Sequence, residues 1–194
     1  MDKLKVKVII GSTREGRFGD KPAAWIAELA KERADMDIEI LDLRDYPIPF
    51  FDQQETPSYK TKPYNEPNVV KLTAKIAEAD AYIITVAEYN HGYTAVLKNA
   101  MDWVYQEWNN KPVAFVAYGS AGGARAIEQL REVAIELQLA PIRNAVHMTY
   151  DAVIAIGQGT APAQAFAPYV DRAKALLEQL AWWGNALKAA RIKA

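Results

Sequence analysis

The sequence contains no cysteine and has only two histidines among its 194 residues. The absence of cysteine excludes disulfides, iron–sulfur ligation, thiol nucleophiles and thiolate zinc sites. With only His91 and His147 available, a Ser-His-Asp triad has few routes, and we expect no metal site. The chain also lacks an excess of charge of either sign: 23 Lys and Arg against 24 Asp and Glu give a net charge of -1. Binding to nucleic acid or to an acidic membrane favours a strongly basic face, so we expect neither partner.

Long apolar runs are missing as well. The longest are the size of a strand, far short of the ~20 residues that a membrane span needs. The first predicted strand begins too early to leave room for a signal peptide. We therefore expect one soluble, cytoplasmic domain over residues 1–194, in which a hydrophobic content of 51% fills a sizeable core.

Five segments have apolar patterns typical of strands, and helical patterns separate them. The strand patterns cover residues 4–10, 37–41, 81–86, 113–118 and 145–148. The helical patterns begin near residue 18 and cover about 69–79, 97–103, 127–137 and 166–190. This alternation predicts a doubly wound parallel α/β sheet with the strand order 2-1-3-4-5. Right-handed crossovers then bring the loops after strands 1, 3 and 4 together at the carboxyl edge of the sheet.

The loop after the first strand, Gly11-Ser12-Thr13-Arg14, has the chemistry of a phosphate site. It offers backbone N–H groups, a helix N-terminus, two hydroxyls and a guanidinium to one anion. Arg17 and Lys21 can add charge at its rim. The alternative is a helix N-terminus capped by Ser12 or Thr13, with Arg14 solvated. The strand–loop–helix context favours phosphate, while the dinucleotide and Walker patterns are both absent.

The loop after the third strand, Ala87 to Gly92, combines the aromatic ring of Tyr89 with the polar side chains of Asn90 and His91. A flat heterocycle needs such an apolar wall for its face and polar groups at its edge. The alternative is that Asn90 caps the next helix and Tyr89 simply packs.

The loop after the fourth strand, Gly119-Ser120-Ala121-Gly122-Gly123, lets backbone approach a ligand closely, and its N–H groups can bond a ring carbonyl. A tight strand-to-helix turn is the simpler explanation when this loop is taken alone. Because the segment does not fit Gly-x-Ser-x-Gly, we do not expect Ser120 to be a nucleophile.

Residues 44–67 form a long connection with five prolines, at positions 47, 49, 57, 63 and 67. Exposing its aromatic residues to solvent would cost free energy; they are Phe50, Phe51, Tyr59 and Tyr64. Loops of this length are often lids or binding loops, and a packed surface excursion is the equal alternative.

Taken together, the loops resemble the NAD(P)H-dependent FMN reductase family of flavodoxin-like proteins, which also covers quinone, azo-compound and chromate reductases. The resemblance spans nearly the whole chain. It is carried by Gly11–Arg14, by Glu88-Tyr89-Asn90 followed by Leu97–Trp103, and by Gly119–Gly123.

This resemblance implies a flavodoxin-like fold, bound FMN, NADPH or NADH as electron donor, and a quinone, azo, metal-oxyanion or flavin acceptor reduced by a ping-pong mechanism. Because flavin N5 carries the chemistry, no catalytic side chain is implied. Phosphate binding falls to Ser12, Thr13 and Arg14, with Phe18, Gly19 and Asp20 nearby. Ala87, Glu88, Tyr89 and Asn90 border the isoalloxazine, and Gly119, Ser120 and Gly122 face its pyrimidine edge. Ala87 stands where the family usually has proline.

The resemblance also implies a homodimer or homotetramer in which a neighbour helps to wall the flavin. Trp103, Tyr105 and Trp108 are candidates for such a contact, and an intrachain core is the equal alternative. In the final helix, periodicity predicts that one of Trp182 and Trp183 faces the sheet, while the other is partly exposed or at an interface.

Two other functions remain open at this point. The first is a flavodoxin-type electron carrier or non-catalytic flavin-binding module, against which the near-neutral charge argues, because such carriers tend to be strongly acidic. The second is a scaffold that has lost flavin, which the retained Arg14 and Glu88–Asn90 segment disfavour. A preference for NADPH over NADH would follow if Arg17 and Lys21 met a 2′-phosphate.

Overall fold

A computed structural model of the chain describes residues 2–59 and 64–193. Its five strands are β1 (Leu4–Ile10), β2 (Met36–Asp42), β3 (Ala81–Ala87), β4 (Pro112–Tyr118) and β5 (Ala140–Met148). Its α-helices are α1 (Asp20–Lys31), α2 (Pro67–Ala77), α3 (Ala95–Trp103), α4 (Ala124–Glu136), α5 (Tyr150–Gly157), α6 (Pro162–Ala165) and α7 (Val170–Lys193). All neighbouring strands pair in parallel, in the order β2-β1-β3-β4-β5. The predicted fold class and strand order are confirmed.

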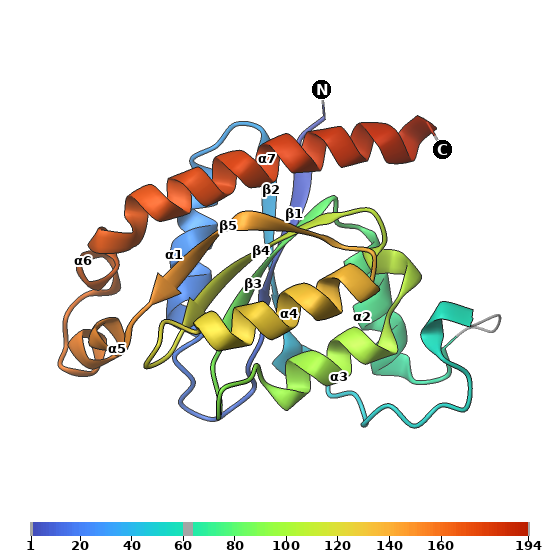
Figure 1. The fold of residues 1–194 in the computed structure, drawn as a ribbon, viewed down its shortest axis with the longest axis horizontal. Helices are drawn as coiled ribbons and strands as arrows, with labels where there is room; N and C mark the ends of the chain where they lie inside the picture. The colour runs from blue at the N-terminus through green and yellow to red at the C-terminus, as the bar shows by residue number, and fades with distance from the viewer. Residues whose placement is uncertain (1, 60–63, 194) are drawn as a thin grey trace.

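Helices cover both faces of the sheet (Figure 1). One core lies between the sheet and helices α1 and α7, and the second lies between the sheet and helices α2, α3 and α4. Every residue of β3 and β4 is buried, as the continuous apolar runs of central parallel strands require. The edge strand β2 instead mixes buried, half-buried and exposed residues. The sheet is therefore a rigid platform whose carboxyl edge presents the loops.

The last strand is longer than predicted. Its apolar pattern was clear only over residues 145–148, whereas β5 begins at Ala140. Pro141 and Arg143 interrupt the pattern, and the pairing with β4 shifts register between Val113 and Phe115. An edge strand tolerates proline because one side of it makes no ladder bonds.

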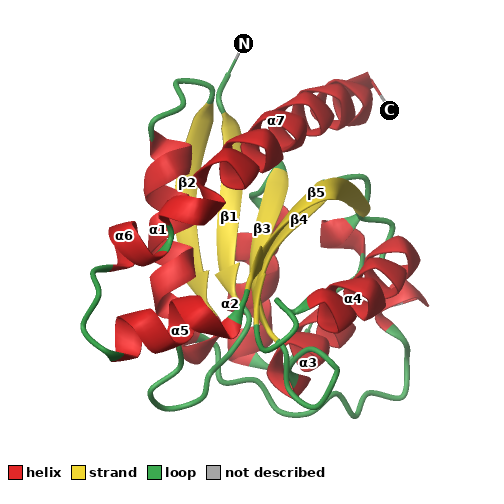
Figure 2. Cartoon of the chain, turned by 60° about the vertical axis from the view of Figure 1, so that its left-hand side comes forward, coloured by secondary structure: helices red, strands yellow, loops and turns green. Residues whose placement is uncertain are grey.

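The segment after β5 also differs from the prediction, which placed a single helix at about 166–190. Two short helices, α5 and α6, come first, and α7 begins only at Val170. Helix α5 is apolar without a clear stripe, so it lacks the periodicity that identifies a surface helix. Figure 2 shows α5 near the ends of the strands, beside the loops that follow them.

The prediction that Trp182 or Trp183 faces the sheet is wrong. Their exposed fractions are 67% and 36%, and their rings pack edge to face on each other at 5.3 Å. Gly184 sets this orientation, because a Cβ there would lie 2.8 Å from a side-chain carbon of Leu4. Close approach of α7 to β1 at Gly184 leaves the two tryptophans outside the buried stripe.

Trp103 and Trp108 belong to the core of this chain, with exposed fractions of 1% and 2%. The indole N–H of Trp103 donates to the carbonyl of Pro49 at 2.8 Å, and the ring of Trp108 packs on Tyr82 at 4.8 Å. Of the two alternatives, the intrachain core therefore holds for both rings, and the half-buried Tyr105 packs against the same core.

The long connection packs on α3. Asn99 and Trp103 both donate to the Pro49 carbonyl at 2.8 Å, and Phe51 packs on the Trp103 ring at 5.1 Å. Phe50 and Tyr59 are exposed nonetheless, at 77% and 80%, and Pro63 lies outside the described residues. These contacts favour the packed excursion over the lid.

Among the described residues, no helix is both long enough and apolar enough to cross a membrane.

Lys111 lies at the amino end of the sheet, immediately before β4, and is 7% exposed. Its Nζ donates to the carbonyls of Ile76 and Ala77 at 3.1 Å and to the hydroxyl of Tyr82 at 3.2 Å. The buried ammonium thus provides hydrogen bonds to the last two carbonyl groups of α2.

Burial lowers the pKa of Lys111 from 10.5 to about 8, which predicts a pH-dependent stability. Between these two values the unfolded chain binds more protons than the folded one, so the free energy of unfolding rises with pH. From pH 7 to pH 9.5 we expect wild type to gain roughly 1–2 kcal/mol relative to Lys111→Met, measured by urea unfolding. Identical pH profiles for the two proteins would contradict this.

Candidate functional site

Loops from three strands and the helix α5 surround a cavity of about 200 Å³ at the carboxyl edge of the sheet. Its lining residues are Arg14, Phe18, Ala87, Glu88, Tyr89, Tyr118, Gly119, Tyr150 and Val153. Six of these nine are predicted site residues. The other predicted residues do not line this cavity: Ser12, Thr13, Gly19, Asn90, Ser120 and Gly122 lie in the same three loops, and Asp20 is the first residue of α1.

The loop between β1 and α1 is held tightly at its start. A Cβ on Gly11 would lie 2.5 Å from the carbonyl oxygen of Thr85 in β3, so only glycine fits there. The Gly11 carbonyl accepts a hydrogen bond from the hydroxyl of Thr94, which also caps α3 through the Leu97 N–H at 3.3 Å. Thr94 was missed by the sequence analysis, although a threonine just before a helical pattern is a typical cap.

Beyond Gly11, several backbone donors of the loop are free, although the Arg14 N–H donates to the Ser12 hydroxyl at 3.4 Å. In the part of the chain that the structure describes, the N–H groups of Thr13, Glu15 and Gly16 donate to no protein acceptor, and the Arg14 side chain forms no ion pair. Helix α1 is preceded by Gly19 without a side-chain cap, so the alternative in which Ser12 or Thr13 caps it is wrong. Unpaired N–H groups and a free guanidinium suit an anion.

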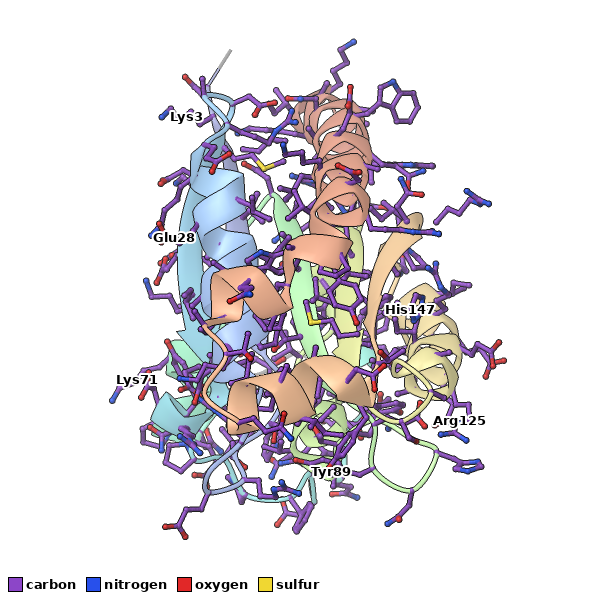
Figure 3. The ribbon with its side chains drawn as sticks, turned by 90° about the vertical axis from the view of Figure 1, so that its left-hand side faces the viewer. Lys3, Glu28, Lys71, Tyr89, Arg125 and His147 are labelled. Carbon is purple, nitrogen blue, oxygen red and sulfur yellow. The ribbon has the colours of Figure 1, made fainter. Side chains whose placement is uncertain are left out.

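Tyr89 connects this loop to the loop after β3. Its hydroxyl lies 2.9 Å from the hydroxyl of the buried Ser12, and the Arg14 guanidinium sits 5.6 Å from the centre of its ring. The two predicted halves of the site are therefore in direct contact. Figure 3 shows Tyr89 at the end of the molecule opposite Lys3.

Arg17 does not provide a free positive charge at the rim. It is 7% exposed, donates to the carbonyl of Ser12, and forms ion pairs with Asp20 and Asp42. Asp42 and Asp20 raise the pKa of Arg17 still further above its ordinary value. The expectation that Arg17 meets a nucleotide phosphate is therefore wrong. The Arg17 side chain instead holds the loop in place through the Ser12 carbonyl, and Asp20 is one of its ion-pair partners.

Residues Tyr89 to Gly92 form a tight turn, closed by two backbone hydrogen bonds of 2.8 and 3.0 Å. Its central residues Asn90 and His91 have φ values of 51° and 70°, and such a turn favours asparagine. Asn90 does not cap α3, because Thr94 does. The turn directs Tyr89 toward the first loop.

Glu88 is the most buried charged side chain of the cavity lining, with 3% of its side chain exposed. One carboxylate oxygen, Oε1, accepts from Arg125 Nε at 2.6 Å. The other, Oε2, has no hydrogen-bond partner among the described residues. Arg125 comes from α4 and was missed by the sequence analysis, since no local pattern relates it to Glu88.

The glycine loop after β4 makes a tight turn and also passes close to Glu88. Gly122 and Gly123 have φ values of 64° and 69°, and a Cβ on Gly119 would lie 3.1 Å from that of Glu88. The N–H groups of Gly119 and Gly122 already donate to Met148 and Gly119. In the described chain this leaves the N–H groups of Ser120, Ala121 and Gly123 free for a ligand.

Three lining residues were not predicted. Tyr118 ends β4, is buried, and packs on Phe18 at 5.0 Å. Tyr150 and Val153 belong to α5. Position at the carboxyl end of a predicted strand could have pointed to Tyr118, whereas no local signal placed α5 over the site.

The strand order and a site at the carboxyl edge between β1 and β3 define a flavodoxin-like α/β protein. A family profile described as NADPH-dependent FMN reductase matches residues 4–152. An NAD(P)H-dependent FMN reductase of Schizosaccharomyces pombe is 36% identical over 152 residues, covering 77% of this chain and 76% of the relative. A quinone reductase of Escherichia coli K12 is 31% identical over 143 residues, covering 70% of this chain and 72% of the relative.

The fold is likewise similar to that of FerB, a flavoenzyme NAD(P)H:(acceptor) oxidoreductase from Paracoccus denitrificans. The TM-score is 0.71 at 22% sequence identity, covering 91% of this chain and 97% of FerB. The chain belongs to the NADPH-dependent FMN reductase family and is an oxidoreductase of that type. Its cofactors are accordingly FMN and NAD(P)H.

The residues present fit FMN. Free N–H groups and Arg14 in the first loop suit a phosphate monoester, and a cavity walled by tyrosine and phenylalanine rings suits a flat ring system.

The structural role of Arg17 predicts a loss of stability on substitution. Arg17→Met leaves the carboxylates of Asp20 and Asp42 without their cation, and we expect the free energy of unfolding to fall by about 2–4 kcal/mol. The exposed Lys21, changed to methionine, is the matched control and should cost less than about 0.5 kcal/mol. Urea unfolding of both variants measures the difference, and equal effects would contradict the assignment.

Proposed function

We propose that this protein is an FMN-containing oxidoreductase that takes hydride from NAD(P)H and delivers it to an organic or oxyanion acceptor by a ping-pong mechanism. The observation that supports it is the free Arg14 guanidinium and free N–H groups beside a cavity walled by aromatic rings. The acceptor classes we propose are quinone, azo compound, metal oxyanion and free flavin.

In this proposal each loop has one task. The first binds the FMN phosphate through Ser12, Thr13 and Arg14, with Phe18, Gly19 and Asp20 supporting the loop. The third strand's loop borders the ring with Ala87, Glu88, Tyr89 and Asn90. The glycine loop faces the pyrimidine edge with Gly119, Ser120 and Gly122. Tyr118 and Tyr150 add apolar walls.

Bound FMN would supply the hydride chemistry at its N5 atom. The protein's contribution is positioning and electrostatics. The free N–H groups of Ser120, Ala121 and Gly123 can stabilise negative charge on a ring carbonyl. No side chain has to act as an acid or base. One cavity serving donor and acceptor in turn is the reason for proposing ping-pong kinetics.

We further propose that residues 1–194 form a single domain and that it assembles as a homodimer or homotetramer. An electron carrier without turnover is the alternative, and two features favour the enzyme over it. The charge of -1 is close to neutral, and Arg14 is free to bind an anion.

Charge reversal at Arg14 tests the phosphate site. Arg14→Glu places a carboxylate beside the FMN phosphate, and we expect FMN affinity to fall about 100-fold or more, measured by flavin fluorescence titration of the apoprotein. Lys71→Glu makes the same charge change at an exposed position on α2 that does not line the cavity, and it should change the affinity by less than about fivefold. Undiminished FMN binding by a folded Arg14→Glu protein would overturn the phosphate assignment.

The kinetic mechanism has a separate test. Initial rates of NADPH oxidation at several fixed benzoquinone concentrations should give parallel double-reciprocal lines, because donor and acceptor use one cavity in turn. Bound flavin should also be bleached by NADPH alone, before any acceptor is added. Intersecting lines, or no bleaching, would contradict ping-pong turnover, and bleaching without turnover would favour the electron carrier.

A further inference from the structure

The helix α5 forms one wall of the cavity, yet little of it is buried against the rest of the chain. Tyr150 and Val153 line the cavity, and Figure 2 shows α5 near the ends of the strands. Ala152 is the only buried one of its eight residues. The apolar side chains of Tyr150 and Ile154 are 55% and 44% exposed. Because packing of an apolar face supplies most of the stability of a short helix, α5 is weakly held.

Few hydrogen bonds connect α5 to other elements. Among the described residues, the hydrogen bonds of residues 150–160 all have their partners within residues 149–160. The connection to the rest of the chain is the hydroxyl of Tyr169. This hydroxyl lies 3.3 Å from both the N–H and the Oγ1 of Thr149, the residue directly before α5. The Tyr169–Thr149 contact therefore holds one end of the helix in place.

Both ends of α5 allow it to move. The helix starts directly after β5, at Thr149, and it ends in Gly157-Gln158-Gly159. Gly159 has a φ of 93°, which glycine adopts without strain. A Cβ at Gly157 or Gly159 would meet no atom within 4 Å, so nothing packs against either position. Segment ends with few contacts are the places that absorb the backbone changes of a hinge.

The other walls of the cavity are fixed to the body of the protein. Arg17 holds the first loop, Thr94 joins that loop to α3, and Arg125 holds the loop after β3. The N–H of Gly119 ties the glycine loop to β5 through the carbonyl of Met148. Of the four walls, α5 thus has the weakest connection to the two cores, so it is the wall that opens at the lowest free energy.

We propose that α5 is a hinged cover of the cavity, held closed by the Tyr169–Thr149 contact, and that it selects acceptors by their size. Small acceptors enter while the cover is closed. Larger flat acceptors enter only when α5 swings outward at Thr149 and at Gly157–Gly159. The free energy of opening then adds to the barrier for large acceptors alone. This inference rests on the proposed function, which places donor and acceptor in this cavity.

The first test uses the absence of cysteine from the chain. Ala152→Cys places a thiol on the buried side of α5, and Ala100→Cys places one on α3 as the matched control, since the two alanines are 5% and 4% exposed. In the full-length protein, Ellman's reagent should modify the thiol at position 152 about 100-fold faster or more, because α5 opens without global unfolding. Hydrogen exchange of wild type, which needs no variant, should show faster exchange for the amides of α5 than for those of α3.

The second test removes the contact that holds the cover closed. Tyr169→Phe keeps the ring and loses the hydroxyl, so modification of the Ala152→Cys thiol should accelerate about 2- to 10-fold, as for the loss of one hydrogen bond. The kcat/KM for menadione, a two-ring quinone, should rise by a similar factor relative to that for benzoquinone. Tyr105→Phe is the matched control. It removes the hydrogen bond of a tyrosine to Gln138, away from α5, and should change neither quantity.

Each part of the inference can fail separately from the proposed function. Equal modification rates at positions 152 and 100, with equally slow amide exchange in α5 and α3, would show that α5 is a fixed wall. Unchanged thiol reactivity in Tyr169→Phe would overturn the role of the Tyr169–Thr149 contact. An unchanged ratio of menadione to benzoquinone turnover, in a variant whose cover opens faster, would overturn the selection by size. Lack of quinone reduction by folded wild type would overturn the proposed function, while the thiol reactions would still decide whether α5 opens.

Discussion

Arg17 lies beneath the loop between β1 and α1, where its guanidinium bonds to the carbonyl of Ser12 and to the carboxylates of Asp20 and Asp42. The geometry of the loop depends on this interaction. Asp42 ends β2 and Asp20 begins α1, so one buried cation connects the neighbouring strand, the loop and the helix. Because these partners neutralise Arg17, it is Arg14 rather than Arg17 whose charge is available to an anion at this loop.

The fold brings the remaining parts together through topology. Parallel strands end at the same edge, so loops separated by some 75 residues in the chain meet there, as the Ser12–Tyr89 contact of 2.9 Å shows. The loops also brace one another. Thr94 joins the first loop to α3, the Glu88 N–H joins β3 to β4, and Arg125 joins the third strand's loop to α4. The site is thus positioned by elements that are themselves packed on two cores.

The sequence predicted what local patterns encode. Buried runs such as Ile83–Val86 identify central strands, their alternation with helices fixes the sheet order, and polar loops at strand ends mark the site. It could not predict features set by contacts between distant segments. Arg17 looked like a surface charge because Asp42 is 25 residues away, and α5 lacks the periodicity that reveals a helix. One of Trp182 and Trp183 was expected to face the sheet, because the contact of Gly184 with Leu4 that sets the rotation of α7 leaves no signal in the local sequence.

Lys111 and the cavity lie at opposite ends of β4, since Lys111 precedes this strand and the cavity-lining Tyr118 ends it. Within the described chain, the hydrogen-bond partners of this buried ammonium are therefore not among the residues that line the cavity. Energetic effects of changes at well-separated sites usually add. Stabilising replacements at the amino end of the sheet can accordingly be combined with specificity changes at its carboxyl edge. Protein engineers can therefore change the two regions independently.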